Sequence, residues 1–165
     1  MQHPTRIDPG PGQESVWDYP RPPRLERIVS RVTITFAGKL VADTTGAMRI
    51  LETSHPPTVY IPPGDIDMSV VEKASGTSMC EWKGRAKYVD LVIGDRRSEQ
   101  AGWYYPSPVA AYAELKDFIS FYPSRVDQCT IDGEVVQAQE GDFYGGWITK
   151  NLVGPFKGAP GTRGW

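Results

Sequence analysis

Histidine and cysteine are scarce in this chain of 165 residues, which holds two of each. It has no Cys-x-x-Cys pair and no His-Glu-x-x-His segment, so the sequence predicts no metal site of the usual zinc types. Binding of Mg²⁺ through Glu52, Asp65 or Asp67 stays open, because carboxylates are its preferred protein ligands. Cys80 and Cys129 fall in different predicted strands, which would permit a disulfide, but we expect free thiols. The sequence identifies no cofactor.

Long apolar runs and an excess of one charge are also missing. No stretch approaches the roughly 18 apolar residues of a membrane helix, and residues 1–6 lead into no apolar signal region. We therefore expect a cytoplasmic protein without a membrane partner. The 18 basic and 20 acidic residues give a net charge of −2, which disfavours binding to nucleic acid. The phosphate-binding Walker loop, the dinucleotide fingerprint and the Gly-x-Ser-x-Gly elbow of hydrolases are absent as well.

Proline and glycine are abundant, with 15 and 17 residues, and this favours short strands and many turns. We predict one domain in three parts. Residues 1–24 form an extended arm without regular structure, whose Trp17 and Tyr19 pack back onto the body. Residues 25–140 form a β domain, and residues 141–165 form a Gly/Pro-rich extension that packs on that domain.

Alternation of polar and apolar residues predicts a mainly β fold, either a small barrel or a rolled sheet with one or two short helices. Val32, Ile34 and Phe36 mark the first clear strand, and Gly38 permits a reversal into the next. Further strands are predicted at Lys39–Asp43, Arg49–Glu52, Thr58–Ile61, Ser78–Trp82, Arg85–Ile93, Ala101–Tyr105, Cys129–Ile131 and Glu134–Val136. Asp132-Gly133 predicts a type I′ hairpin turn. Val109–Phe118 is the one predicted helix, with a helical turn near Met68–Lys73.

Polar and aromatic residues gather at the predicted strand ends, where the mouth of a barrel would present them to a ligand. The predicted ligand-binding set is Arg49, Glu52, His55, Tyr60, Cys80, Trp82, Lys83, Trp103 and Tyr105. A continuous strand would place Cys80 and Trp82 on one face and Lys83 on the other. Lys83 is then either an anion contact or a solvated side chain.

Two features have stronger structural interpretations. A buried, inert Cys80 is favoured over a nucleophilic one, because cysteine is among the most buried residue types. The segment Phe143–Trp147 is interpreted as a turn flanked by packing aromatics. Further aromatic residues, among them Tyr104, Tyr144 and Trp147, are divided between core packing and a pocket for a flat ligand.

Several longer segments recur together in one known family. They are Leu51-Glu-Thr-Ser-His-Pro-Pro57, Tyr60-Ile-Pro62, Cys80-Glu-Trp-Lys-Gly84, Trp103-Tyr-Tyr-Pro106, Phe121-Tyr122, Phe143-Tyr-Gly-Gly-Trp-Ile-Thr149, Val153-Gly-Pro-Phe-Lys-Gly158 and Pro160-Gly-Thr-Arg-Gly-Trp165. From about Val16 to Trp165 the chain thereby resembles the longer form of the DUF427 family, a domain of unknown function that has also carried a nucleotidyltransferase-like label.

The resemblance implies a small barrel of the Mss4-like or β-tent-like kind. Relatives of that group often hold zinc through two Cys-x-x-Cys knuckles, which this chain lacks, so zinc is not implied here. Nucleotidyltransferases need a Gly-Ser pair followed by paired acids that hold two metals. Asp65 and Asp67 follow Pro62-Pro63-Gly64 without that pair, so we interpret the label as a family name and not as a mechanism.

Three functions remain open at this point. The leading hypothesis is a module that binds a small anionic or aromatic ligand in a pocket at one end of the barrel. The second is an enzyme that acts on a small metabolite through Cys80, His55 or Lys83, with Glu52 as acid or base. The third is a protein-interaction module that uses the arm and the tail, for which a homodimer is one form.

Overall fold

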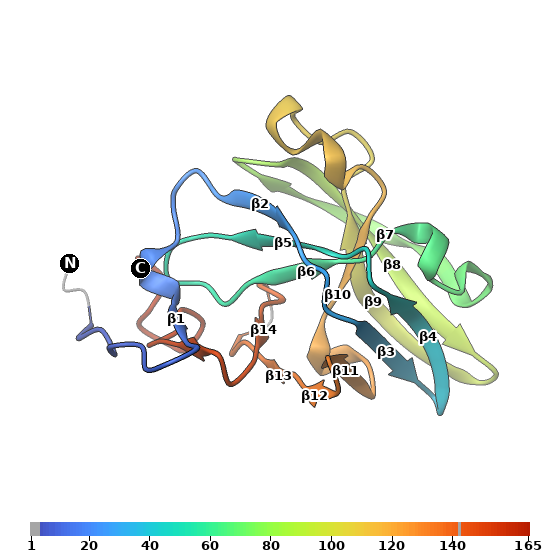
Figure 1. The fold of residues 1–165 in the computed structure, drawn as a ribbon. Helices are drawn as coiled ribbons and strands as arrows, with labels where there is room; N and C mark the ends of the chain where they lie inside the picture. The colour runs from blue at the N-terminus through green and yellow to red at the C-terminus, as the bar shows by residue number, and fades with distance from the viewer. Residues whose placement is uncertain (1–3, 142) are drawn as a thin grey trace.

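The computed structural model describes residues 4–141 and 143–165 of the chain; the first three residues of the predicted arm and residue 142 of the predicted tail lie outside this part. The described residues form fifteen strands and five short 3-10 helices, which confirms the predicted mainly β class. In Figure 1 the first described residues of the arm and the C-terminal end of the chain lie at the same side of the molecule. No helix in the described part is long and apolar enough to cross a membrane.

Antiparallel strands form the three larger sheets, while two additional strand pairs involve the arm and the tail. The first sheet has the order β10-β9-β8-β7, with β7 at Val71–Cys80, β8 at Gly84–Ile93, β9 at Arg96–Tyr104 and β10 at Ile119–Phe121. The second has the order β12-β11-β3-β4, with β3 at Val32–Phe36, β4 at Lys39–Thr44, β11 at Gln128–Ile131 and β12 at Glu134–Val135. The third has the order β2-β5-β6, with β2 at Arg24–Arg27, β5 at Met48–Leu51 and β6 at Thr58–Tyr60.

The sheets do not close into a small barrel, one of the two forms that the sequence left open. The third sheet meets the first through a single bridge, in which Ile61 and Ile119 exchange backbone hydrogen bonds of 2.8 and 2.9 Å. In the described residues, β2 and β7 stand at the far edges of these two sheets and do not pair with each other. Closure requires every edge strand to find a partner, and that condition is not met here.

The arm and the tail carry regular structure of their own, so the prediction of an arm without regular structure was wrong. Strand β1 (Glu14–Ser15) pairs in parallel with β15 (Leu152–Val153), and a 3-10 helix follows at Val16–Asp18. A second pair joins β13 (Gln137–Ala138) to β14 (Trp147–Ile148). These strands have no alternating pattern of polar and apolar residues, because two residues are too few to show a period.

Three groups of buried side chains hold these sheets together. The main core lies between the first and second sheets and includes Ile34, Leu91 and Phe121, all essentially without exposed surface. An aromatic group around Tyr60 and Trp103 lies beside it. A third, smaller group joins arm, third sheet and tail through Val16, Tyr19, Leu51 and Leu152.

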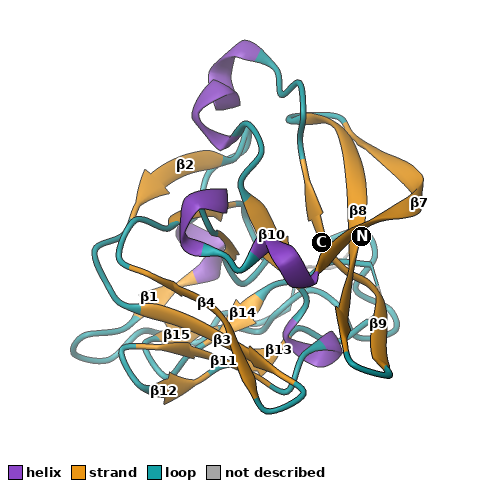
Figure 2. Cartoon of the chain, turned by 90° about the vertical axis from the view of Figure 1, so that its right-hand side faces the viewer, coloured by secondary structure: helices purple, strands orange, loops and turns teal. Residues whose placement is uncertain are grey.

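The helix predicted at Val109–Phe118 is shorter in the structure and of another type. A 3-10 helix occupies Ala110–Leu115, with non-helical backbone at Tyr112. The Tyr112 hydroxyl donates a 2.6 Å hydrogen bond to the Pro23 carbonyl, and Leu115 is fully buried. Helices this short are not stable by themselves, so these two tertiary anchors determine the local shape. Figure 2 shows the helices as short purple segments among the orange strands. The helical turn predicted near residues 68–73 is a 3-10 turn at Met68–Val70.

The predicted hairpin at Asp132-Gly133 is confirmed. It joins β11 to β12, and both central residues have positive φ, 49° at Asp132 and 82° at Gly133. Only glycine adopts this region without a steric cost. We expect Gly133→Ala to lower the free energy of unfolding by about 1 kcal/mol, measured by urea unfolding.

Gly64→Ala is the matched control, because a Cβ at either position would meet no atom within 4 Å and Gly64 lacks positive φ. Its expected effect is below about 0.5 kcal/mol. Equal losses in the two variants would contradict the role of turn geometry.

Candidate functional site

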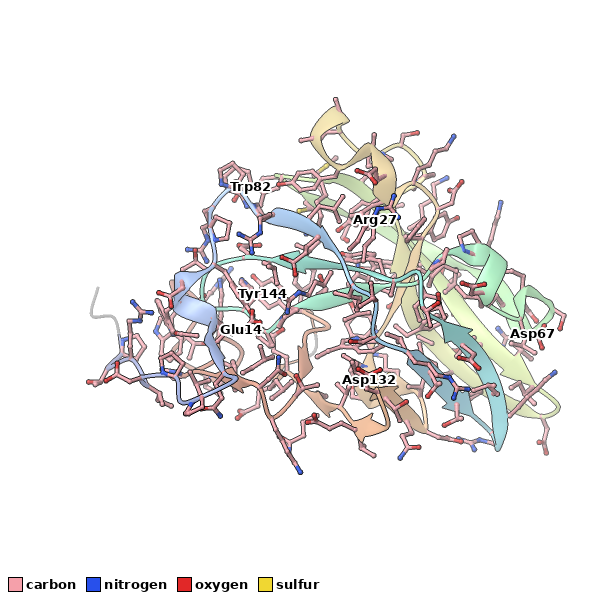
Figure 3. All side chains as sticks on the ribbon, viewed as in Figure 1. Glu14, Arg27, Asp67, Trp82, Asp132 and Tyr144 are labelled. Atoms are coloured by element: carbon pink, nitrogen blue, oxygen red, sulfur yellow. The ribbon has the colours of Figure 1, made fainter. Side chains whose placement is uncertain are left out.

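A cavity of about 230 Å³ lies among the third sheet, the end of the β7–β8 hairpin, β9 and the C-terminal segment. Aromatic side chains dominate its walls: Tyr60, Trp82, Tyr88, Trp103, Tyr105 and Tyr122. Polar and charged residues also line it: Glu52, His55, Thr58, Ser78, Glu81, Lys83 and Gln139. Figure 3 labels two lining residues, Trp82 at the free end of the β7–β8 hairpin and Tyr144 in the C-terminal segment.

The structure brings eight of the nine predicted site residues together around this cavity. They are Glu52, His55, Tyr60, Cys80, Trp82, Lys83, Trp103 and Tyr105. Arg49 is the exception. It lies on β5 next to cavity-lining Ile50, so the alternation of the strand directs it to the other face. There it pairs with Glu26 at 2.7 Å and Glu14 at 3.4 Å.

The segment from Cys80 to Gly84 is not the continuous strand that the sequence suggested. Strand β7 ends at Cys80, residues 81–83 form the hairpin turn, and β8 begins at Gly84, which has a φ of 114°. The turn carries Lys83 to the cavity side, where it is only 8% exposed. The predicted placement of Lys83 on the face opposite Cys80 was therefore wrong, because both residues line the cavity.

Lys83 is a buried cation without an acidic partner in contact. In residues 4–141 and 143–165, no carboxylate oxygen lies within 4.0 Å of its ammonium group. The ammonium lies 5.9 Å from the centre of the Tyr105 ring. Burial lowers its pKa, but the nearby Tyr60, Cys80 and Glu52 outweigh burial and leave the pKa above its usual value. Lys83 is therefore protonated at neutral pH.

His55 lies in a loop that forms backbone hydrogen bonds with both the arm and the tail. The Ser54 backbone N–H donates to Val16 O in the arm at 3.0 Å, and Ser54 O accepts from Lys157 N in the tail at 2.9 Å. Farther along the loop, Trp147 N donates to Pro57 O at 2.8 Å. Arm and tail therefore position the cavity wall that carries His55.

Hydrogen bonds indicate how the His55 ring is protonated. The Gln139 side-chain oxygen accepts from Gly146 N at 3.1 Å, so its amide nitrogen faces Lys157 O at 2.7 Å and His55 Nδ1 at 3.5 Å. Nδ1 is then the acceptor, and Nε2 carries the proton toward Glu52, 3.6 Å away. Burial, together with the positive charges of Lys157, Arg21 and Lys83, lowers the pKa of His55 to about 3. The imidazole is neutral at physiological pH.

The aromatic walls form a connected set of ring contacts. Trp103 packs edge-on to Tyr60 at a centroid distance of 6.0 Å and lies 4.8 Å from Tyr122. The indole N–H of Trp103 donates to the Tyr60 hydroxyl at 3.2 Å. Burial is the main reason that the pKa values of Tyr105 and Tyr122 lie above their usual value. These phenols stay protonated and present neutral faces to the cavity.

The sequence did not predict the contribution of the tail. Phe143, Tyr144 and Gly145 line the cavity, although the segment was interpreted as a turn with packing aromatics. Gln139 lies in the segment Gln137-Ala-Gln-Glu140, whose pattern carries no signal for a buried site. Tyr104 and Trp147, which the sequence left divided between core and pocket, both pack in the main core.

The two cysteines are free and lie in different surroundings. Cys129 is 1% exposed in the main core, and burial raises the pKa of its thiol to about 12. Cys80 is partly exposed and lines the cavity. In the described part of the chain, no three His, Cys, Asp or Glu side chains are grouped as a metal site requires. Of the acids considered for Mg²⁺, Asp65 accepts from Thr44 and Asp67 pairs with Lys39.

Comparison with known proteins identifies the family. The family model NTP_transf_9, which is described as a domain of unknown function (DUF427), matches residues 24–132. The chain belongs to the DUF427 family. A search of curated proteins finds no match. The matched DUF427 range contains His55, Lys83 and Trp103, whereas Gln139 and the cavity-lining residues 143–145 lie beyond it. The cavity therefore combines DUF427 residues with the tail.

Proposed function

We propose that this DUF427 chain binds a small organic anion with a flat, unsaturated body in the cavity described above. The observation that carries the proposal is Lys83, a protonated side chain that is 8% exposed, lines the cavity and contacts no described carboxylate. Burying a charge without a partner is costly. An anionic ligand would supply the missing partner.

The surrounding charges support an anion over a cation. Three positive groups, Lys83, Lys157 and Arg21, are near enough to depress the pKa of His55. The carboxylate of Glu52 lies among them and forms a salt bridge with Arg21, with 3.3 Å between Arg21 Nε and Glu52 Oε2. Because His55 is neutral, these three positive groups outnumber the two carboxylates that line the cavity, Glu52 and Glu81. An incoming anion would therefore meet a favourable potential.

Size and wall chemistry indicate the rest of the ligand. A cavity of about 150 Å³ is known to accept benzene, so 230 Å³ accommodates one ring with a carboxylate. The aromatic walls offer edge and face contacts to such a ring. A monocyclic aromatic carboxylate satisfies both requirements, and benzoate is the simplest probe.

The test is calorimetric titration of the purified chain with benzoate and with benzamide, its neutral counterpart of equal size. We expect benzoate to bind and to raise the melting temperature, because a ligand of the folded state stabilises it. We expect benzamide to bind at least tenfold more weakly. Lys83→Met should weaken benzoate binding at least tenfold and leave benzamide unchanged.

Lys87→Met is the matched control, because Lys87 lies on β8 four residues away and is exposed. Its benzoate affinity should stay within twofold of that of the wild-type chain. Absence of benzoate binding to the wild-type chain, or equal affinity in Lys83→Met, would overturn the proposal.

The other sequence-based expectations stay predictions. They are a cytoplasmic location, no interaction with nucleic acid, the possible homodimer, the kinship to Mss4-like or β-tent-like folds, and the division at residues 24 and 140. The interaction hypothesis needs an arm and a tail free to engage a partner, whereas β1 and β15 pair within one chain. We therefore rank ligand binding above it.

A further inference from the structure

The hairpin turn places a cysteine and a buried lysine at the same wall of the cavity. Cys80 ends β7 and pairs with Gly84, the first residue of β8. Its side chain packs against the aromatic group and lines the cavity. Lys83 lies in the turn between these two strands, directly before Gly84, and lines the same cavity.

Two observations distinguish this thiol from an ordinary structural cysteine. Cys80 is partly exposed within a cavity, whereas Cys129 is enclosed in the apolar core. Lys83, which is more than nine-tenths buried and has no acidic contact among the described residues, lines the same cavity and points to an anionic occupant.

The placement of the two residues restricts the chemistry of the occupant. Cys80 pairs with Gly84, the residue after Lys83, and both Cys80 and Lys83 line the cavity, so an anionic group at Lys83 would lie on the same wall as the sulfur. In a small ligand, the carbon that reacts with this sulfur must therefore be close to the anionic group. Carboxylates with an electrophilic α- or β-carbon meet this requirement.

We propose that Cys80 is the nucleophile of this pocket and that its substrates are small carboxylates with an electrophilic carbon, held by Lys83. This inference deepens the proposed function and rests on it. With an α,β-unsaturated carboxylate, the sulfur bonds to the β-carbon as the C=C π bond breaks. The electron pair moves to the α-carbon, which takes up one proton, and the thiol gives up one. The addition is balanced and needs no oxidant or reductant.

The test compares two alkylating reagents of similar size, iodoacetate and iodoacetamide. In both, a sulfur–carbon bond forms, the carbon–iodine bond breaks, iodide leaves and the thiol proton goes to buffer. The rates at Cys80 and Cys129 are measured separately by mass spectrometry of the native protein. Glutathione, treated in parallel, gives the ratio of the two rates for a thiol without an anion site.

We expect Cys80 to react at least tenfold faster than Cys129. We expect its iodoacetate-to-iodoacetamide ratio to exceed that of glutathione at least fivefold, because Lys83 attracts only the charged reagent. Lys83→Met should reduce the ratio to the glutathione value, while Lys87→Met should preserve it. Benzoate should slow the reaction of Cys80 with both reagents.

Each failure has a distinct meaning. An unreactive Cys80 in a chain that still binds benzoate overturns this inference and leaves the proposed function intact. If Cys80 reacts with the same iodoacetate-to-iodoacetamide ratio as glutathione and benzoate gives no protection, both this inference and the proposed function are overturned. The wild-type ratio needs no variant, so the test does not depend on whether Lys83→Met folds.

Discussion

Replacing Trp147 by alanine should lower the free energy of unfolding by about 3–5 kcal/mol, the range found for large aromatic side chains removed from a core. Trp147 lies in the tail, yet it is 1% exposed within the main core. Its indole N–H donates to the Phe121 carbonyl at 3.0 Å, and this acceptor would lose its partner in the variant. Urea unfolding followed by circular dichroism measures the loss.

Val135→Ala provides the comparison, because Val135 lies on nearby β12 and is 54% exposed. We expect its effect to stay within about 0.5 kcal/mol. If Trp147→Ala costs less than about 1 kcal/mol, the tail is an appendage and not part of the core. The expected result would show that residues beyond the family match are needed for a stable fold.

Acid should destabilise the protein through His55 by about 2–3 kcal/mol between pH 7.5 and pH 4.5. The pKa of His55 is about 3 in the folded chain and about 6.5 in the unfolded chain. Above pH 6.5 the residue is neutral in both states and adds no pH dependence. Between pH 6.5 and 3 only the unfolded state binds the proton, so stability falls by about 1.4 kcal/mol for each pH unit.

The measurement is urea unfolding of the wild-type chain and of His55→Gln at four pH values from 7.5 to 4.5. Carboxylates titrate at the lower end in both proteins, so the difference between the two curves isolates His55. We expect the wild-type curve to fall more steeply below pH 6.5. Parallel curves would show that the imidazole is not kept neutral by the fold.

Local patterns predicted much of the strand structure because each depends on near neighbours in sequence. Alternation in Val32–Phe36 and the Asp132-Gly133 turn both correspond to observed elements. The candidate site was predictable in part for the same reason, since its residues lie in or beside β5, β6, the β7–β8 turn and β9. These segments carry conspicuous aromatic and charged residues.

Errors arose where the side that a residue faces depends on a turn or on a distant segment. The alternation of Cys80, Trp82 and Gly84 imitates a strand, but residues 81–83 reverse the chain and bring Lys83 into the cavity. Arg49 has the residue type of an anion contact, yet the pairing of β5 directs it toward Glu26. Gln139 reaches His55 only after the tail has packed, and no local pattern encodes that contact.

The pairing of β1 with β15 also bears on the order in which the molecule assembles. Glu14 and Leu152 are neighbours in space although 138 positions separate them in sequence, and such contacts carry the largest loop-closure entropy. Hairpins such as β7–β8 can form early, because their residues are close together in the chain. The loop of His55 gains its contacts to Val16 and Lys157 only when the first and last segments meet. We therefore expect the cavity to mature in the slowest folding phase, after most of the sheet structure is in place.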